Sequence, residues 1–535
     1  MPFNGNRRLW ERTKTMWQCK RVTLVGCLIL LELFLTTPSF GQSPPLDLWT
    51  PEVMARIRDQ STLNHQIITH AGYFELFYDS EIGEAKWADS GEPYEVHTGD
   101  TIRIHGFLAS PLVGGPYPGI VIGHGHHGQA SRELAIALAA LGYVALSISG
   151  PQAGRSTGGP SDTEQAWISV EEVINEPAPE VGYLYHYAYA GMRGLTLLQR
   201  LARLPLNPFR IDPNRLGVLG ASMGGQFTYY INGVDDRVKG AVAIAVAGDW
   251  QKLIFYPGAW FYHGLFYYTR DGLKSRQDQL NTISDVCEDP TMFTFLSYFD
   301  PISYAPTQHG PLLTILGTHD QYFTIPAINT TYDQVTSAGT DPRFIKRVML
   351  SANGKHGVLD EADLLRSVTA VIQDVDSWFK YSFRGGPTPL ETPTVRSQVV
   401  GEAIEFRVSV TPGSREIRSV DLNFATQLDT TVPTPCDFAT LTLSPQGNEY
   451  VGSVAMSASP PCGPAVTPEN ILYYATVKDA ANYTITSKMY YKASEMDFCS
   501  DFVPLIEHFP RDTFPVQPPP APNCTCPRGA SPALP

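Results

Sequence analysis

The sequence predicts an α/β fold, with a mostly parallel sheet covered by helices on both faces, followed by a smaller all-β domain. Three observations predict this architecture. Between residues 95 and 383, short apolar runs alternate with segments of helical period, which is typical of consecutive βα units. One of these runs leads through a Gly-x-Ser-x-Gly turn directly into a helical segment. Beyond residue 393, short alternating strands separated by turn residues indicate a β-sandwich of immunoglobulin-like type.

The chain is long and acidic. Its 535 residues exceed one ordinary domain, and its 43% of hydrophobic residues can fill a large core. The formal net charge is −14, and no basic patch with interleaved aromatic residues occurs. This composition argues against a nucleic-acid partner.

The N-terminus has the features of a secretory signal peptide over residues 1–41. A basic segment precedes the apolar run Val22–Leu35, and small residues precede a cleavage site before Gln42. The run is short for a membrane-spanning helix and contains Glu32. We therefore expect a secreted or periplasmic protein with no stable membrane span after cleavage. An uncleaved segment that anchors the chain in the membrane is the alternative.

Cysteine usage agrees with export. Six cysteines remain after the predicted cleavage, and most of them lie in the C-terminal part of the chain. Disulfides are expected there, and Cys436 with Cys462 is the easiest pair to form, although the connectivity stays open. A zinc site is the alternative, but Cys524 and Cys526 are too close in sequence for the usual ligand spacing.

The pattern along the chain suggests five regions after the signal segment. The α/β region closes with an amphipathic helix over Val358–Phe383, and a Gly- and Pro-rich stretch follows it. The expected regions are an N-terminal extension packed on the core (42–94), the α/β domain (95–383), a linker (384–393), the β-sandwich (394–510) and a proline-rich tail (511–535).

Ser222 is the predicted nucleophile. The apolar strand Leu216–Leu219 leads into Gly220-Ala221-Ser222-Met223-Gly224, and a helical stretch follows from Gln226. A sharp turn of this kind exposes the serine hydroxyl at the tip between strand and helix, and small residues are needed where the backbone segments approach each other. An ordinary βα turn is the alternative.

Asp320 and His356 are the predicted partners of the serine. Asp320 follows the buried strand pattern at 311–317, and His356 lies in a glycine-flanked loop after the strand pattern at 344–350. A serine needs a base to accept its proton and a carboxylate to orient that base. Asp249 is the alternative acid and His319 the alternative base, although His319 adjoins Asp320.

The second predicted feature is an oxyanion hole. The loop His124–Gly128 follows the strand pattern at 119–123, and Gly125 allows the backbone to turn toward the site. We expect the N–H groups of Met223 and His126 to stabilise the negative charge that develops on the substrate. The three histidines of the loop also suggest zinc, but no further cluster completes a metal site. Neither a metal nor a cofactor is expected.

A lid insertion is predicted at residues 249–305, above the carboxyl ends of the strands. The segment is rich in aromatic residues, which either contact substrate or form the lid's own core. The substrate-contacting residues predicted here and nearby are Tyr185, His127, Trp250 and Trp260.

These residues, in this order, resemble the α/β-hydrolase superfamily, especially its dienelactone-hydrolase-like and acetyl-xylan-esterase-like branches. The resemblance spans about residues 95–383 and includes the run Gly150–Ser156 after the next strand. Dienelactone hydrolases carry a cysteine at the turn where this chain has Ser222. The resemblance implies the α/β-hydrolase fold and a triad of Ser222, His356 and Asp320.

The resemblance also implies an exported serine hydrolase that cleaves carboxylic esters through an acyl-enzyme. Acetylated glycans and small acyl esters are the expected substrates, and the oligomeric state stays open. A serine peptidase of prolyl-oligopeptidase or dipeptidyl-peptidase type shares the turn and the triad order, although no propeller-sized region precedes residue 95. A non-catalytic binding protein on a hydrolase scaffold is the alternative outside enzymes.

Overall fold

The computed structural model describes most of the chain between residues 48 and 495. The predicted signal segment, all eight cysteines, Trp260 and the proline-rich tail lie outside the described residues, so the predictions made for them stay predictions. The described residues are 48–88, 96–162, 179–250, 298–320, 322–323, 325–359, 364–426, 437–461, 464–491 and 494–495.

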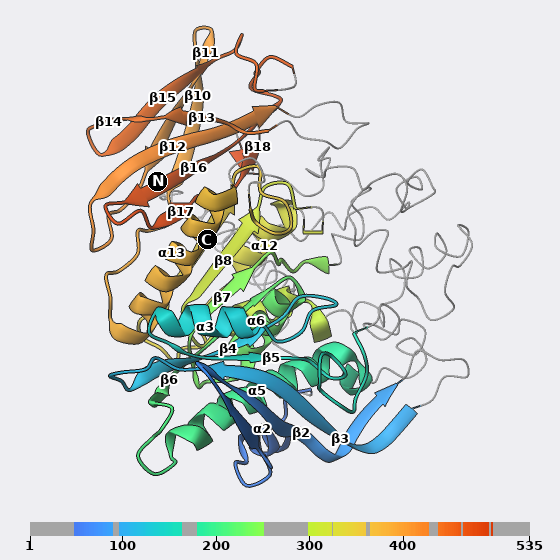
Figure 1. Cartoon of the computed structure of the whole chain (residues 1–535). Helices are drawn as coiled ribbons and strands as arrows, with labels where there is room; N and C mark the ends of the chain where they lie inside the picture. The colour runs from blue at the N-terminus through green and yellow to red at the C-terminus, as the bar shows by residue number, and fades with distance from the viewer. Residues whose placement is uncertain are drawn as a thin grey trace, which may run out of the picture. The chain divides into compact units, whose positions relative to one another are not determined.

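A nine-stranded sheet forms the centre of the larger part of the chain (Figure 1). Its order is β1-β2-β3-β5-β4-β6-β7-β8-β9; the first three strands run antiparallel to their neighbours, and the six from β5 to β9 are parallel. The strands are β1 (Gln66–His70), β2 (Tyr73–Ala88), β3 (Val96–Ala109), β4 (Tyr117–Gly123), β5 (Val144–Ile148), β6 (Ile211–Ala221), β7 (Val238–Ile244), β8 (Leu312–Gly317) and β9 (Lys346–Ser351).

Helices cover both faces of this sheet, as the sequence predicts. Alternate residues of a strand enter different clusters: Val121 packs with α5 and α6, whereas Ile120 and Ile122 pack with α3 and α13. Near-continuous apolar strands are therefore buried on both sides. The helices are α2 (Pro51–Arg58), α3 (Arg132–Ala140), α5 (Tyr183–Ala202), α6 (Met223–Val234), α11 (Pro301–Tyr304), α12 (Ile325–Gln334) and α13 (Leu364–Arg384), with 3₁₀ turns η1 (Pro179–Val181) and η2 (Ala305–Thr307).

One predicted helix face differs in the structure. The spacing of Leu134, Leu138 and Leu141 suggests a buried leucine stripe, but Leu134 is 40% exposed. The buried side of α3 consists of Ala135, Leu138 and Ala139. Small alanines let the helix approach the sheet closely, and the leucine is displaced toward solvent.

The N-terminal extension contributes strands to the sheet. Residues 42–94 are expected to form an extension outside the α/β domain, but within them β1 and β2 belong to the central sheet, where β2 pairs with β3. The α2 helix is attached to α5 by Arg193, which is 1% exposed. Its guanidinium donates to the carbonyls of Arg56 and Ile57 in the last turn of α2.

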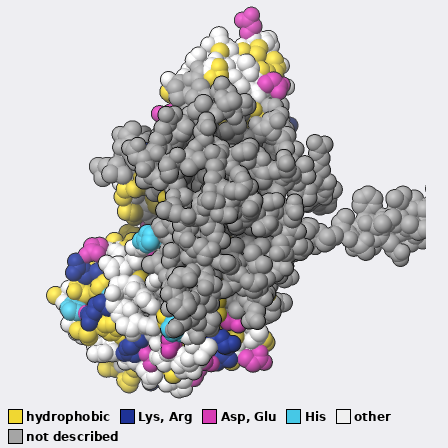
Figure 2. All heavy atoms as spheres, turned by 90° about the vertical axis from the view of Figure 1, so that its right-hand side faces the viewer, with side chains coloured by type: hydrophobic (Ala, Val, Ile, Leu, Met, Phe, Trp, Pro, Cys, Tyr) yellow, Lys and Arg dark blue, Asp and Glu magenta, His cyan; other side chains and the backbone are white. Residues whose placement is uncertain are grey.

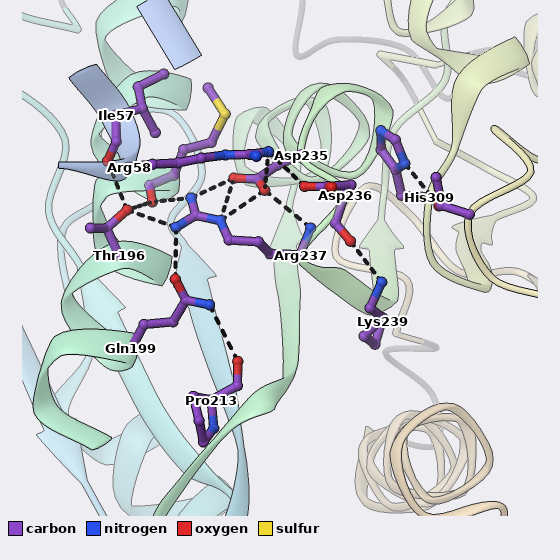
Figure 3. Close-up of polar contacts among 12 residues, drawn as sticks. Ile57, Arg58, Thr196, Gln199, Pro213, Asp235, Asp236, Arg237, Lys239 and His309 are labelled. Atoms are coloured by element: carbon purple, nitrogen blue, oxygen red, sulfur yellow. Dashed lines mark hydrogen bonds and ion pairs between the residues drawn. The ribbon is translucent and has the colours of Figure 1, made fainter. Parts of the chain in front are cut away.

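A second buried network ties α2, α5 and the end of α6 together (Figure 3). Asp235 follows α6 and is fully buried; its carboxylate accepts from Arg237 Nη2 at 2.6 Å and from Nε at 2.9 Å. Arg237 Nη1 donates to Thr196 Oγ1 at 2.8 Å, and that hydroxyl donates to the Ile57 carbonyl at 2.7 Å. Burial opposes ionisation of Asp235, but Arg237 and Arg58 hold its pKa below the usual value.

The Asp235→Asn variant should therefore lose about 3 kcal/mol of unfolding free energy, because a nearly buried guanidinium loses its counter-charge. Urea unfolding at pH 7 measures this loss. Asp236 is the matched control, since it is exposed and pairs with Arg58 at 2.6 Å; Asp236→Asn should cost less than about 1 kcal/mol. Because the pKa of Asp235 is lowered, the wild-type advantage should be complete above about pH 4 and should decline as the pH falls further, through the folded-state pKa. Equal losses for both variants would contradict this account.

The C-terminal part is a β-sandwich of two antiparallel sheets. The first sheet has the order β10-β11-β15-β14, and the second β13-β12-β16-β18-β19, with β17 paired to β16. Phe406 of the first sheet and Tyr473 of the second face each other with ring centroids 4.9 Å apart. The strands are β10 (Thr394–Val400), β11 (Ala403–Ser409), β12 (Ile417–Thr426), β13 (Ala439–Thr442), β14 (Ser444–Gln446), β15 (Glu449–Ala455), β16 (Ile471–Asp479), β17 (Thr484–Thr486), β18 (Tyr490–Tyr491) and β19 (Ser494–Glu495).

Hydrogen bonds join β17 to the α/β sheet. The Leu350 N–H of β9 donates to Thr486 Oγ1 at 3.0 Å, and the Thr484 N–H donates to Asp374 Oδ1 of α13 at 2.8 Å. The Phe438 N–H donates to Asn353 Oδ1 at 2.7 Å, in the loop that follows β9. The sandwich therefore braces the last strand, the last helix and the loop between them.

None of the helices in the described ranges is long and apolar enough to cross a membrane. On the face drawn in Figure 2, basic and acidic side chains lie interspersed in the lower part of the view, and further acidic side chains lie at its top.

Candidate active site

The backbone around Ser222 forms a strained turn between β6 and α6. Ser222 has φ +58° and ψ −121°, a conformation that L-residues rarely adopt. A Cβ at Gly220 would lie 2.1 Å from the Gly224 carbonyl oxygen, and one at Gly224 would lie 2.4 Å from the Gly123 oxygen. Only glycine fits at these two positions, so the Gly-x-Ser-x-Gly sequence is required by the close packing of the turn.

The sheet register brings the predicted partners to the same edge. Gly123 of β4 pairs with Gly220 of β6, so the loop after β4 and the turn after β6 are neighbours. Strands β8 and β9 are parallel to β6 and end on the same side, with Asp320 just after β8 and His356 after β9.

Ser222, His356 and Asp320 form a continuous hydrogen-bonded chain. His356 Nε2 lies 2.8 Å from Ser222 Oγ. His356 Nδ1 lies 2.9 Å from Asp320 Oδ2 and 3.1 Å from Oδ1. A carboxylate beside Nδ1 favours the proton on that nitrogen, which leaves Nε2 to accept from the serine hydroxyl. The arrangement can therefore transfer a proton from Ser222 to His356.

Local backbone groups hold the acid in place. The N–H groups of Tyr322 and Phe323 donate to Asp320 Oδ1 at 2.8 and 3.0 Å. The Asp320 side chain is fully buried, whereas that of His356 is 21% exposed. The Tyr322 ring lies 4.4 Å from the His356 ring, which limits the movement of the imidazole. The site thus has a rigid buried acid and a base that reaches the surface.

The two alternatives considered from sequence lie elsewhere. His319 Nδ1 lies 2.9 Å from Thr318 Oγ1, and its ring is 4% exposed. Asp249 is buried beside Asp300, which contributes to the electrostatics around it. His356, and not His319, occupies the position beside the Ser222 hydroxyl.

The predicted oxyanion loop lies directly against Ser222. A Cβ at Gly125 would lie 3.4 Å from Ser222 Cβ and 3.9 Å from Ser222 Oγ. Met223 is the first residue of α6, so its N–H has no acceptor within the helix. The positive end of the α6 dipole adds to the attraction for negative charge at this point.

The predicted substrate-contacting residues have different surroundings. His127 is more than half exposed at the loop after β4, stacked on His126 with ring centroids 3.8 Å apart. Tyr185 is 6% exposed and stacks on Trp49 at 5.0 Å, so its described contacts belong to the packing of the N-terminal segment on α5. Trp250 is fully buried, and Trp260 lies outside the described residues.

The two ends of the predicted lid are joined at Asp300. Its Oδ2 accepts from the Trp250 N–H at 2.6 Å, and its Oδ1 accepts from the Ile302 N–H at 3.0 Å, where it caps α11. Burial raises the pKa of Asp300 to about 7, and the nearby Asp249 carboxylate adds to this. The residues between, 251–297, lie outside the described part.

This pKa predicts a pH dependence of stability. Asp300 binds a proton in the folded state up to about pH 7, but only below about pH 4 when unfolded. Its contribution to stability is therefore lost as pH rises from about 4 to about 7. We expect the difference in unfolding free energy between wild type and Asp300→Asn to fall by roughly 1–3 kcal/mol between pH 5 and pH 8. Urea unfolding of both proteins at the two pH values measures this difference. The exposed-site variant Asp236→Asn should show no such change; a flat difference for Asp300→Asn would refute the prediction.

No cluster of three or more metal-binding side chains occurs among the described residues.

The strand order, the turn and the triad order now stand together. Strand β5 lies between β3 and β4, the serine follows the central strand β6, the acid follows β8, and the histidine follows β9. The chain has the α/β-hydrolase fold. The turn at Ser222 and the loops that carry Asp320 and His356 all lie at the carboxyl edge of the parallel strands.

Comparisons with known proteins give distant similarities. The family described as PhoPQ-activated pathogenicity-related protein matches residues 190–431. No curated protein sequence matches the chain. Solved structures similar to the chain include an acetyl xylan esterase from a Paenibacillus species, at 16% identity and TM-score 0.41, covering 62% of this chain and 95% of that one.

Two further solved structures show the same level of similarity. Acetyl xylan esterase 1 from a Thermoanaerobacterium species has 16% identity and a TM-score of 0.39, covering 59% of this chain and 90% of that one. The acylaminoacyl peptidase of Pyrococcus horikoshii has 14% identity and a TM-score of 0.37, covering 60% of this chain and 56% of that one.

Proposed function

We propose that this α/β-hydrolase is a serine hydrolase that cleaves carboxylic esters. The observation that carries the proposal is the His356 ring, which bridges Ser222 Oγ and the buried Asp320 carboxylate at 2.8 and 2.9 Å. The fold itself does not require a strained serine that is hydrogen-bonded to a histidine and, through it, to a buried carboxylate. It is the constellation that activates a hydroxyl for attack on a carbonyl.

The proposed reaction has two halves. Ser222 Oγ attacks the ester carbonyl carbon while His356 Nε2 accepts the hydroxyl proton, and Asp320 stabilises the resulting imidazolium. The N–H groups of Met223 and His126 stabilise the oxyanion. His356 then donates its proton to the leaving alkoxide, which departs as an alcohol. Water, activated by His356, attacks the acyl-enzyme and releases the carboxylic acid and Ser222.

Acetylated glycans and small acyl esters are the proposed substrates, and export by the N-terminal segment is part of the proposal. Support for small substrates comes from the exposed His127 and the partly exposed His356 at the site.

A fluorophosphonate probe combined with a substrate panel tests the proposal. The wild-type chain should form a phosphonyl adduct on Ser222, found by peptide mass spectrometry. It should hydrolyse p-nitrophenyl acetate and acetylated xylo-oligosaccharides faster than fluorogenic dipeptides. Faster cleavage of the dipeptides would replace the esterase assignment by the peptidase alternative, and absence of both the adduct and hydrolysis would indicate a binding protein.

A further inference from the structure

One tyrosine side chain holds the backbone of the loop that carries the proposed oxyanion donor. Tyr187 lies in α5 and is fully buried. Its hydroxyl accepts a hydrogen bond from the His124 N–H and donates to the His124 carbonyl at 3.1 Å. Both polar groups of one residue's backbone therefore meet a single hydroxyl, directly before Gly125.

The orientation of Tyr187 is itself determined by packing. Its ring lies 4.9 Å from the His124 ring and 4.8 Å from that of Phe227 on α6. A Cβ at Gly123 would lie 3.0 Å from the Tyr187 hydroxyl and 2.8 Å from the Phe227 ring. The glycine thus makes room for the hydroxyl at the end of β4.

The His124 ring extends the same restraint. Its Nε2 accepts from the Gly150 N–H at 2.9 Å, so its Nδ1 carries the proton and donates to the Gly125 carbonyl at 2.7 Å. Burial lowers the pKa of His124, which keeps the ring neutral in this arrangement. The backbone from the His124 N–H to the Gly125 carbonyl is therefore restrained by the Tyr187 hydroxyl and by the His124 ring.

Asp162 restrains the far side of the loop. Its Oδ2 accepts from the His127 N–H at 2.8 Å, and its carbonyl accepts from His126 Nε2 at 2.8 Å. The Gly128 N–H closes the loop by donating to the Gly125 carbonyl at 2.9 Å. Gly125 to His127 thus lies between two anchors, Tyr187 and Asp162, with Ser222 beside Gly125.

We propose that Tyr187 is a positioning residue for the oxyanion hole, acting through the His124–Gly125 backbone on the direction of the His126 N–H. The proposal rests on the proposed hydrolase function. An oxyanion donor stabilises the transition state only when it points at the place where charge develops, and a displacement of about 1 Å can cost about 100-fold in rate. Loss of the Tyr187 hydroxyl frees the backbone but removes no group that touches substrate.

Tyr187→Phe tests the proposal, with Tyr183→Phe as the matched control. Tyr183 lies one turn earlier on the same helix and is equally buried, and its hydroxyl has no hydrogen-bond partner among the described residues. With p-nitrophenyl acetate, Tyr187→Phe should lower kcat by about 10- to 100-fold with KM within about twofold of wild type. Tyr183→Phe should leave both constants unchanged.

A transition-state analogue separates positioning from general loss of structure. The inhibition constant of phenylboronic acid, whose tetrahedral adduct uses the oxyanion hole, should rise with Tyr187→Phe in proportion to the loss of kcat. Asp162→Ala, which releases the other end of the loop, should shift both quantities in the same direction. Unchanged kcat and inhibition constant in Tyr187→Phe would overturn the inference.

The same set of measurements keeps the two proposals apart. If the wild-type chain neither reacts with fluorophosphonate nor cleaves any ester or peptide, the proposed function fails. If the wild-type chain is active and Tyr187→Phe, with an unfolding temperature equal to that of Tyr183→Phe, behaves like wild type, only the positioning role fails.

Discussion

Replacing Ser222 by alanine is expected to lower kcat/KM for p-nitrophenyl acetate by about 10⁴- to 10⁶-fold. The reason is that the acyl-enzyme cannot form without the hydroxyl, so the two-step reaction is replaced by unassisted attack of water. Initial rates at matched protein concentrations measure the loss. The adduct with fluorophosphonate should disappear together with the activity.

Ser80→Ala is the matched control for this substitution. Ser80 is a buried serine of β2, 3% exposed, and its hydroxyl has no partner among the described residues. Its removal should leave hydrolysis and labelling unchanged. Full activity in Ser222→Ala would show that another residue is the nucleophile, and loss of activity in both variants would point to damage to the fold.

Replacing Asp320 by asparagine should lower kcat by about 10⁴-fold while KM changes little. The amide keeps the shape of the side chain, and its oxygen can still accept from the Tyr322 and Phe323 N–H groups. Its NH₂ group would then face His356 Nδ1 and favour the tautomer with the proton on Nε2. That tautomer cannot accept the proton of Ser222.

Asp249→Asn distinguishes the two acids considered from sequence. Asp249 also follows a parallel strand, but it lies beside Asp300 and not at His356. The variant should keep wild-type kcat. A large loss in Asp249→Asn with normal kcat in Asp320→Asn would reverse the assignment of the acid.

The region around Ser222 could be predicted because its constraints are local. Strand, turn and helix follow one another within a few residues, and the close approaches of Gly220 and Gly224 leave no alternative side chain. The strand patterns before Asp320 and His356 were similarly visible, because strands buried on both faces are nearly continuous in apolar residues. The sequence favours Asp320 over Asp249 as the acid, but both residues follow a strand of the same sheet, and the contact with His356 belongs to the tertiary structure.

The N-terminal strands show the opposite case. Gln66–His70 and Tyr73–Ala88 belong to the central sheet through antiparallel pairing with β3. The sequence of a strand does not by itself determine which strand it pairs with, because the backbone hydrogen bonds are the same for every pairing. The predicted start of the α/β domain at residue 95 therefore lies between β2 and β3, which are neighbours in the same sheet.

The contacts that restrain the predicted oxyanion loop could not be predicted from the sequence either. Tyr187 and Asp162 lie 63 and 35 residues from their partners His124 and His127, and each belongs to a different segment. The sequence suggests only Tyr185 of this segment as a substrate-contacting residue. Tertiary packing selected Tyr187 for the loop and turned Tyr185 toward Trp49.

The sequence by itself determined a parallel sheet covered by helices, the strained turn at Ser222 and the chain order of Ser222, Asp320 and His356. Steric fit in the turn and the spacing of apolar residues along a strand or helix act over short distances in the chain. The sequence also favours Asp320 and His356 as the partners of the serine, whereas only the tertiary structure decided which strands extend the sheet and which tyrosine contacts the loop after β4. Those outcomes depend on distances between residues far apart in the chain, and such distances exist only once the sheet has assembled.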